Sequence, residues 1–164
     1  MAGNESKRVT AIMSHPIFIE KINIIEKKEK DREFCKHGIE HLLSVARIAE
    51  IINLKENLNI DEELIYATSL LHDIGRSEEG KHEEKGCEIA KQILSECGFA
   101  DEEVYIITEA ILEHRHNNEK SSKEVNIMCD VLKRADHLSR NCFLCSAIDE
   151  CNWEDDRKNK TILY

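Results

Sequence analysis

The chain has 164 residues, a length that suits one globular domain with its own core. Its 23 Lys and Arg against 33 Asp and Glu give a formal net charge of −10. Because proteins that bind long DNA or RNA depend on clustered Lys and Arg, this acidity argues against such a partner. The sequence has no apolar run of membrane-spanning length and no secretory signal near its start. We therefore expect a cytoplasmic protein without a membrane partner.

The composition favours an all-α fold. One Pro, six Gly and 5% aromatic residues are typical of helices joined by short connections. Apolar residues recur at helical spacing in about six blocks, and none alternates as a half-buried strand does. We predict a single-domain bundle of about six helices. Residues 1–33 would hold an N-terminal helix and a linker, residues 34–140 the helical core, and residues 141–164 a Cys-containing extension packed on or trailing from it.

The first two predicted helices each carry their apolar residues on one stripe. The first begins near Pro16 and includes Ile22 and Ile25, and the charged stretch EKKEKDRE after it is interpreted as a solvated end or a linker. The second covers residues 38–54 and places His41 on its apolar stripe. We therefore expect His41 to face the core.

The third predicted helix ends on two side chains of metal-binding type. It begins at Asp61, where the sequence DEE favours the N-terminal end of a helix, and closes at Gly75, a residue suited to a left-handed C-cap. His72 and Asp73, in the sequence LLHDIGR, then fall in the last turn. Adjacent helical residues point about 100° apart, but near a helix end both can reach an ion beyond it.

The last three predicted helices add further polar groups. A polar loop that contains His82 leads into the fourth helix, which ends at Gly98. The fifth helix starts near Asp101 and places His114 at the end of an apolar stripe. The sixth carries Asp136 on its apolar stripe, so this carboxylate is expected to face inward.

Four inward groups from three helices favour a shared metal ion. A single inward His or Asp is more often an ordinary hydrogen-bonded residue, but burying a carboxylate without a partner is unfavourable. A common divalent ion removes that penalty, and a mixed nitrogen and oxygen ligand set suits a transition metal. The four groups are His41, His72, Asp73 and Asp136.

The motifs that carry these residues resemble the HD superfamily of metal-dependent phosphohydrolases. HGIEHLLSVARIAEII, LLHDIGR and LKRADHLSR match the superfamily in order and local character over roughly residues 34–140. The resemblance implies an HD-domain-like helical fold. It also implies that His41, His72, Asp73 and Asp136 bind a divalent transition metal such as Fe, Mn, Ni, Co or Zn. Asp73 would in addition hold the attacking water as a general base.

Some members of the superfamily use further histidines, at places that match His82 and His114. These two side chains would bind a second metal or contact the substrate phosphate, and we expect both to line the same cavity as the four ligands. Cationic side chains near the loops are candidates for binding phosphate, although each is as well explained as a solvated charge. They are Arg76, Lys81, Arg115, Lys133 and Arg140.

The function implied by the resemblance is hydrolysis of a small phosphate ester or anhydride, with nucleotides the commonest substrate class. A metal lowers the pKa of its bound water and offsets charge on the phosphate. Two alternatives stay open: a di-iron oxygenase of the HD type, which His82 and His114 would permit, and a non-catalytic module that senses metal or nucleotide. The sequence leaves the substrate, the metal, its stoichiometry and the oligomeric state open.

The chain has seven cysteines, and because this number is odd, disulfides cannot pair them all. A reducing compartment explains the count more simply. Cys142, Cys145 and Cys151 lie within ten residues. They could hold a structural metal or an iron–sulfur cluster with a fourth ligand from elsewhere. The alternative is that they are small apolar residues of an amphipathic segment.

Overall fold

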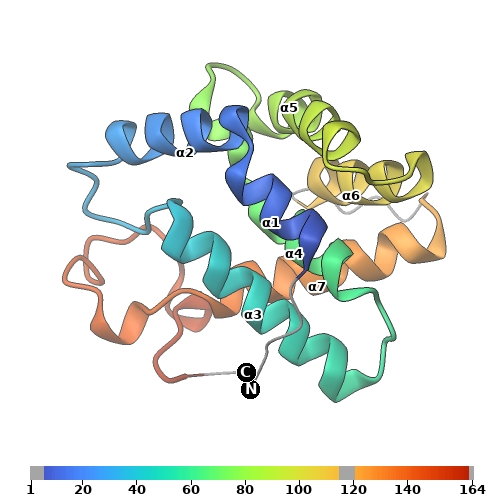
Figure 1. The fold of residues 1–164 in the computed structure, drawn as a ribbon. Helices are drawn as coiled ribbons and strands as arrows, with labels where there is room; N and C mark the ends of the chain where they lie inside the picture. The colour runs from blue at the N-terminus through green and yellow to red at the C-terminus, as the bar shows by residue number, and fades with distance from the viewer. Residues whose placement is uncertain (1–5, 115–120, 163–164) are drawn as a thin grey trace, which may run out of the picture.

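The computed structural model of the chain describes residues 6–114 and 121–162, and within these ranges it contains seven α-helices, three short 3-10 helices and no β-strand (Figure 1). The predicted all-α fold is therefore confirmed. None of the helices in the described ranges is long and apolar enough to cross a membrane. The α-helices are α1 (Lys7–Ser14), α2 (Pro16–Lys28), α3 (Ile39–Glu56), α4 (Glu62–Leu71), α5 (His82–Glu96), α6 (Asp101–Glu113) and α7 (Lys123–Leu138), and the 3-10 helices are η1 (Ile74–Ser77), η2 (Cys142–Leu144) and η3 (Asp155–Arg157).

Helix α4 connects the two parts of the core. Leu70 and Leu71 pack into an apolar cluster built with α1, α2, α5 and α6, whereas Ile65 packs into a second cluster with α3, α6 and α7. Six of the ten residues of α4 are buried. The C-terminal end of this helix therefore lies inside the protein, where its last polar residues are shielded from water.

Local signals in the sequence explain several helix ends. The Asp61 side chain accepts a hydrogen bond from the Glu63 N–H at 2.8 Å and begins α4 as predicted. The Ser122 hydroxyl accepts from the Val125 N–H and begins α7. Gly98 follows α5 in the left-handed region with φ of 82°, which confirms the predicted stop at this residue.

The structure adds α1 ahead of the helix predicted at Pro16. This helix has only eight residues, and two of them, Val9 and Ile12, are buried. Long-range ion pairs hold it in place, since the Arg8 guanidinium contacts the Glu63 and Glu103 carboxylates. Such pairs leave no periodic pattern in the local sequence, which is why α1 was missed.

The predicted C-cap at Gly75 is wrong. Helix α4 ends at Leu71 with His72 as its cap, and the chain then turns into the 3-10 helix η1. Gly75 is needed for a different reason, because a Cβ atom there would lie 1.8 Å from the His82 carbonyl oxygen and 2.5 Å from the Gly86 nitrogen. The absence of a side chain lets α5 approach the end of α4.

The charged connection after α2 is less solvated than predicted. The Glu29 side chain is buried and accepts hydrogen bonds from both the His37 N–H and the His37 ring nitrogen Nδ1, each at 2.7 Å. Lys28 Nζ, at the end of α2, donates to the Ser77 carbonyl in η1. This connection therefore packs against the loop that follows Asp73.

The segment after α7, residues 141–162, is attached to the end of that helix (Figure 1). The buried Asn159 side chain donates to the carbonyl oxygens of His137 and Arg140 at 2.7 and 3.0 Å. The Trp153 ring stacks on the His137 ring with an angle of 3° between the planes. These contacts hold the segment beside the residues that follow Asp136.

Candidate metal centre

His72 is fully buried at the end of α4 and has a fixed ring orientation. Its Nδ1 atom lies 2.7 Å from the Ser69 carbonyl oxygen, which can only accept a hydrogen bond. Nδ1 therefore carries the proton, and the lone pair of Nε2 points away from α4. This arrangement is typical of a histidine held ready for a metal.

His41, on α3, is oriented in a similar way. Its Nδ1 atom lies 3.3 Å from the Ser139 hydroxyl oxygen. That hydroxyl donates its own proton to the Asp136 carbonyl oxygen at 2.7 Å, so it accepts from the His41 ring. The Nε2 atom of His41 thus presents a lone pair toward His72, and the two ring centroids are 5.6 Å apart.

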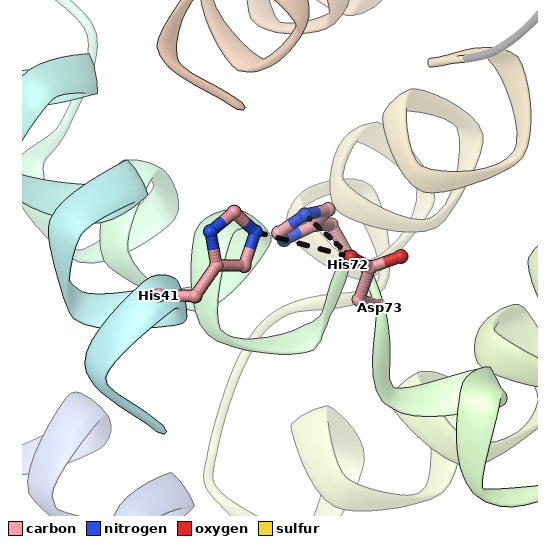
Figure 2. A group of neighbouring side chains, drawn as sticks. All are labelled: His41, His72 and Asp73. Atoms are coloured by element: carbon pink, nitrogen blue, oxygen red, sulfur yellow. Dashed lines mark ion pairs between the residues drawn. The ribbon is translucent and has the colours of Figure 1, made fainter. Parts of the chain in front are cut away.

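Two carboxylates complete the group. Asp73 Oδ2 lies 3.3 Å from His72 Nε2 and 3.9 Å from His41 Nε2. Dashed lines mark these two pairs in Figure 2. Asp136 Oδ1 lies 3.2 Å from His41 Nε2 and 3.9 Å from His72 Nε2. The four side chains predicted from the sequence are therefore brought together by α3, by α4 with the turn after it, and by α7.

The Nε2 atoms of His41 and His72 are buried without a hydrogen-bond partner. The nearby carboxylate oxygens are close enough to attract a charge but lack hydrogen-bond geometry toward these atoms. Ligand atoms of His41, His72 and Asp73 all lie within 4.8 Å of one another. A divalent cation among the lone pairs and carboxylates would satisfy both buried nitrogens, so these residues fit a metal.

Electrostatics keep the two carboxyl groups ionised. Burial acts to raise the pKa of Asp73, but His72, Arg76 and His37 outweigh it and hold that pKa well below its usual range. Burial acts in the same direction on Asp136, where His41, His72 and Arg140 again prevail and lower the pKa.

The pKa values of the His41 and His72 rings are shifted in opposite directions. Burial lowers the pKa of His41. For His72 the effect of burial is outweighed by the Asp73 and Asp136 carboxylates, and its pKa is raised. Protons therefore compete for the ring nitrogens, so binding of a metal at this centre would depend on pH.

His82 and His114 converge on Asp73 from α5 and α6. Ligand atoms of the three residues lie within 4.8 Å of one another. The His114 ring centroid is 5.8 Å from that of His72 and 6.5 Å from that of His82. The His114 Nδ1 atom bonds to the Ile111 carbonyl oxygen, which again directs Nε2 away from its own helix. Asp73 is therefore shared by two adjacent groups of candidate ligands.

His37 is a further polar residue of the centre, which the sequence left open as either a residue supporting the ligands or an exposed one. Only 2% of it is exposed, and its Nε2 atom lies 3.9 Å from Asp73 Oδ2. Burial, reinforced by the Arg76 charge, lowers the pKa of His37 to about 4 against the opposing effect of Asp73 and Glu29. Its spacing of one helical turn before His41 was the only signal in the sequence.

The cationic side chains predicted to bind phosphate differ in their positions relative to the centre. Arg76 donates from Nε to Asp73 Oδ1 at 2.7 Å, and Arg140 donates from Nη2 to Asp136 Oδ1 at 2.6 Å. These two arginines and Lys133 line the cleft that leads to the centre. Lys81 lies on the surface beside Glu84 and does not line it, and Arg115 falls outside the described residues.

The predicted cysteine site is not assembled. Cys142 is buried, Cys145 and Cys151 are partly exposed, and all three are free thiols. In the described part of the chain, no group of three neighbouring ligand atoms includes a thiol. A structural metal at these cysteines therefore stays a prediction, as does the alternative of small apolar residues.

A cleft of about 2170 Å³ reaches the centre at His41, His114 and Asp136, which line it together with His37. His72, Asp73 and His82 do not line it, so the expectation that both His82 and His114 line one cavity with the four ligands holds for His114 alone. The walls of the cleft come from the connection between α2 and α3, from α3 and α7, and from the C-terminal segment. Ten Lys and Arg side chains line it against six Asp and Glu, which reverses the balance of the whole chain. The cleft is therefore suited to an anionic ligand.

Comparison with protein families matches the HD domain to residues 38–141 of the chain. An uncharacterised protein of Clostridium beijerinckii (strain ATCC 51743 / NCIMB 8052) is 45% identical over 161 residues, which cover 96% of this chain and 99% of that protein. No solved structure matches the chain. The family match spans more than half of the chain and contains all four residues brought together at the end of the cleft. The chain belongs to the HD domain family.

Proposed function

We propose that the protein is a metal-dependent phosphohydrolase that cleaves a phosphate ester or anhydride of a small molecule, with a nucleotide as the substrate class. The observation that carries this proposal is the pair of buried, unsatisfied Nε2 atoms beside two carboxylates at the end of a cationic cleft. The first feature supports a metal and the second supports an anionic substrate. Membership of the HD domain family agrees with both.

In this proposal His41, His72, Asp73 and Asp136 hold one divalent transition metal. The bound metal would polarise a phosphate oxygen and lower the pKa of the attacking water. Ser69 and Ser139 fix the two imidazole rings, so neither ring has to reorient on binding. Buried groups that are already aligned bind the ion with little rearrangement.

Asp73 would also hold the attacking water. Its Oδ1 atom is fixed by Arg76, which leaves the other oxygen directed toward the centre. Because the pKa of this carboxyl is held low, it stays ionised and accepts a hydrogen bond from the water. The carboxylate would thereby align the water and receive its proton as the water oxygen bonds to phosphorus. The bond from phosphorus to the leaving oxygen breaks in the same step, and that oxygen keeps the electron pair and takes up a proton from solvent.

His82 and His114 are proposed to bind a second metal together with Asp73, or to contact the substrate phosphate. Their proximity to Asp73 supports either role. Arg76, Lys133 and Arg140 line the cleft and would attract the phosphate there. Seven free thiols support the expectation of a reducing, cytoplasmic environment.

Metal analysis of the purified protein, joined to a phosphate-release screen over nucleotides and sugar phosphates, tests the proposal. We expect at least one equivalent of transition metal and phosphate release that a chelator abolishes. Two equivalents of iron with oxygen uptake and no phosphate release would instead identify the oxygenase that the second ligand group permits. Bound metal with neither reaction would favour a non-catalytic module.

A further inference from the structure

Two arginines meet at the Trp153 ring, on the wall of the cleft formed by the C-terminal segment. The Cζ atom of Arg157 lies 4.8 Å from the centroid of the ring, and that of Arg140 lies 5.9 Å from it. The face of an aromatic ring attracts cations, so Trp153 holds together two guanidinium groups that would otherwise repel each other. We call Trp153, Arg140 and Arg157 the Trp153 clamp.

The Trp153 clamp is fixed from behind. The Trp153 ring stacks on His137, with the ring centroids 5.5 Å apart. The carbonyl of the same histidine accepts a hydrogen bond from the buried Asn159 side chain, which anchors the chain on the far side of Trp153. The position of the ring is thus fixed by contacts with residues that precede and follow it in the sequence. Of the two guanidinium groups beside it, that of Arg140 is also held by its bond to Asp136.

The charge of the Trp153 clamp is only partly compensated. Arg140 bonds to Asp136, but Arg157 has no carboxylate partner among the residues that the structure describes. Lys158 lines the same part of the cleft, with Asp155 at 3.6 Å from its ammonium group. Arg157 is exposed and faces the cleft with its hydrogen-bond donors available. This excess of positive charge fits a phosphate, which guanidinium groups bind through paired hydrogen bonds.

The Trp153 clamp adjoins the candidate metal centre. Arg140 links the two, since its Nη2 atom is 2.6 Å from Asp136 Oδ1 while its Cζ atom lies near Trp153. Arg140 therefore belongs to both places and joins them along the wall of the cleft. Trp153 and Arg157 lie beyond residue 141, where the HD domain match ends, so these two residues add to the family's core, whereas Arg140 lies within the match.

We propose that the Trp153 clamp binds a second phosphate group of the substrate while the first lies at the metal centre. The substrate class is then a small molecule, such as a nucleotide, that carries two phosphate groups. This inference rests on the proposed function for the first phosphate, but binding at the clamp requires neither a metal nor hydrolysis. The two proposals can therefore fail separately.

Trp153 is the only tryptophan in the chain, so its fluorescence reports directly on the clamp. Full-length protein in a chelator is titrated with inorganic pyrophosphate, and sodium chloride of equal ionic strength serves as the blank. We expect a saturable change in emission. In Arg157→Gln the midpoint should rise about tenfold, which corresponds to about 1.4 kcal/mol. Arg157→Lys keeps the charge but not the paired donors, so its midpoint should lie between those of the wild type and Arg157→Gln.

Arg47→Gln is the matched control, because Arg47 lines the same cleft on α3 and the substitution removes the same charge. Its midpoint should move less than about threefold, because Arg47 would attract pyrophosphate only through its charge, and salt screens that attraction. Equal shifts in the two variants would overturn the Trp153 clamp. A calorimetric titration repeats the comparison without fluorescence, and absence of pyrophosphate binding in both assays would also overturn it.

Activity separates this result from the proposed function. Tight pyrophosphate binding that depends on Arg157, without phosphate release from any substrate, would support phosphate binding at the Trp153 clamp and contradict the proposed hydrolase function. If a nucleotide monophosphate released phosphate faster than bisphosphates do, the proposed role of the Trp153 clamp would be contradicted and the proposed hydrolase function supported. Faster turnover of bisphosphates, lost in part in Arg157→Gln, is the result that both proposals predict.

Discussion

Four histidines at the candidate centre are oriented through their Nδ1 atoms. The acceptors are backbone carbonyls for His72 and His114, the Ser139 hydroxyl for His41 and the Glu29 carboxylate for His37. Because a proton on Nδ1 leaves a lone pair on Nε2, these acceptors select the tautomer that a metal needs. Under the proposed function, metal binding therefore depends on residues that do not themselves contact the metal.

Ser139→Ala tests this dependence. Removing the hydroxyl leaves His41 Nδ1 without its acceptor, so we expect metal affinity to fall at least about tenfold while the fold is kept. Competition with a fluorescent chelator measures the affinity. Ser95→Ala is the control, because Ser95 is exposed on α5 and bonds only to the Lys91 carbonyl. Equal affinity in the two variants would show that the hydroxyl does not orient His41.

His37 makes the metal-free protein sensitive to mild acid. Its pKa is lowered to about 4 in the folded state, so the unfolded chain, with a value near 6.5, binds a proton more readily. The stabilisation is present above pH 6.5 and is lost as the pH falls toward 4. The free energy of unfolding should drop by up to about 1.4 kcal/mol per pH unit from this group. Urea unfolding at pH 7 and pH 5 measures it.

His37→Gln should show a smaller drop in unfolding free energy over the same pH interval, since glutamine does not titrate. A wild-type protein whose stability is equal at the two pH values would contradict the assignment. The measurement requires a chelator, because a bound metal would add its own dependence on pH.

At the scale of elements, the approach of α5 to the end of α4 places His82 beside Asp73. A Cβ atom at Gly75 would collide with the His82 backbone, whereas one at Gly86 would meet the Gly75 nitrogen at an ordinary 3.5 Å. Gly75→Ala should therefore displace α5, lower the melting temperature and separate His82 from Asp73.

Gly86→Ala is the matched control for that substitution, and thermal unfolding measures both. Gly86 lies inside α5, where alanine has the higher helix propensity, so this variant should melt at or above the wild-type temperature. If Gly75→Ala melts as the wild type does, α5 is not held by this contact.

The sequence predicted the elements better than their ends. Helical periodicity located the positions of His41, His114 and Asp136, because those side chains continue an apolar stripe toward the core. It did not show that α4 stops before His72, since the stop depends on the packing of η1 against α2 and α5. Burial of Glu29 was missed for the same reason, because its partner His37 lies in a separate connection.

At the scale of the whole molecule, many of the Lys and Arg side chains of this acidic chain lie in one cleft. Ten of the 23 Lys and Arg residues line the cleft, although the net charge is −10. Negative charge elsewhere discourages long polyanions, while the local field attracts a small one. The sequence composition could exclude nucleic acid but could not show this segregation, which arises when α3, α7 and the C-terminal segment come together.

The segregation of charge predicts a dependence on salt. The KM for a phosphorylated substrate should rise several-fold between about 0.05 and 0.5 M sodium chloride, because screening weakens the attraction of the cleft. Steady-state kinetics at both salt concentrations measure the change, and kcat should vary less than KM. A KM independent of salt would show that the cationic lining does not contribute to binding.

Side chains from three parts of the fold are proposed to share one metal ion. The most direct test is the metal content of purified Asp136→Ala compared with Asp130→Ala. Both carboxylates lie on α7, but Asp130 is exposed beside Arg134, whereas Asp136 lies 3.2 Å from His41 Nε2. We predict that Asp130→Ala retains the wild-type equivalents of transition metal and that Asp136→Ala loses at least one, with both variants equally helical. Equal metal content in the two variants would contradict the shared centre.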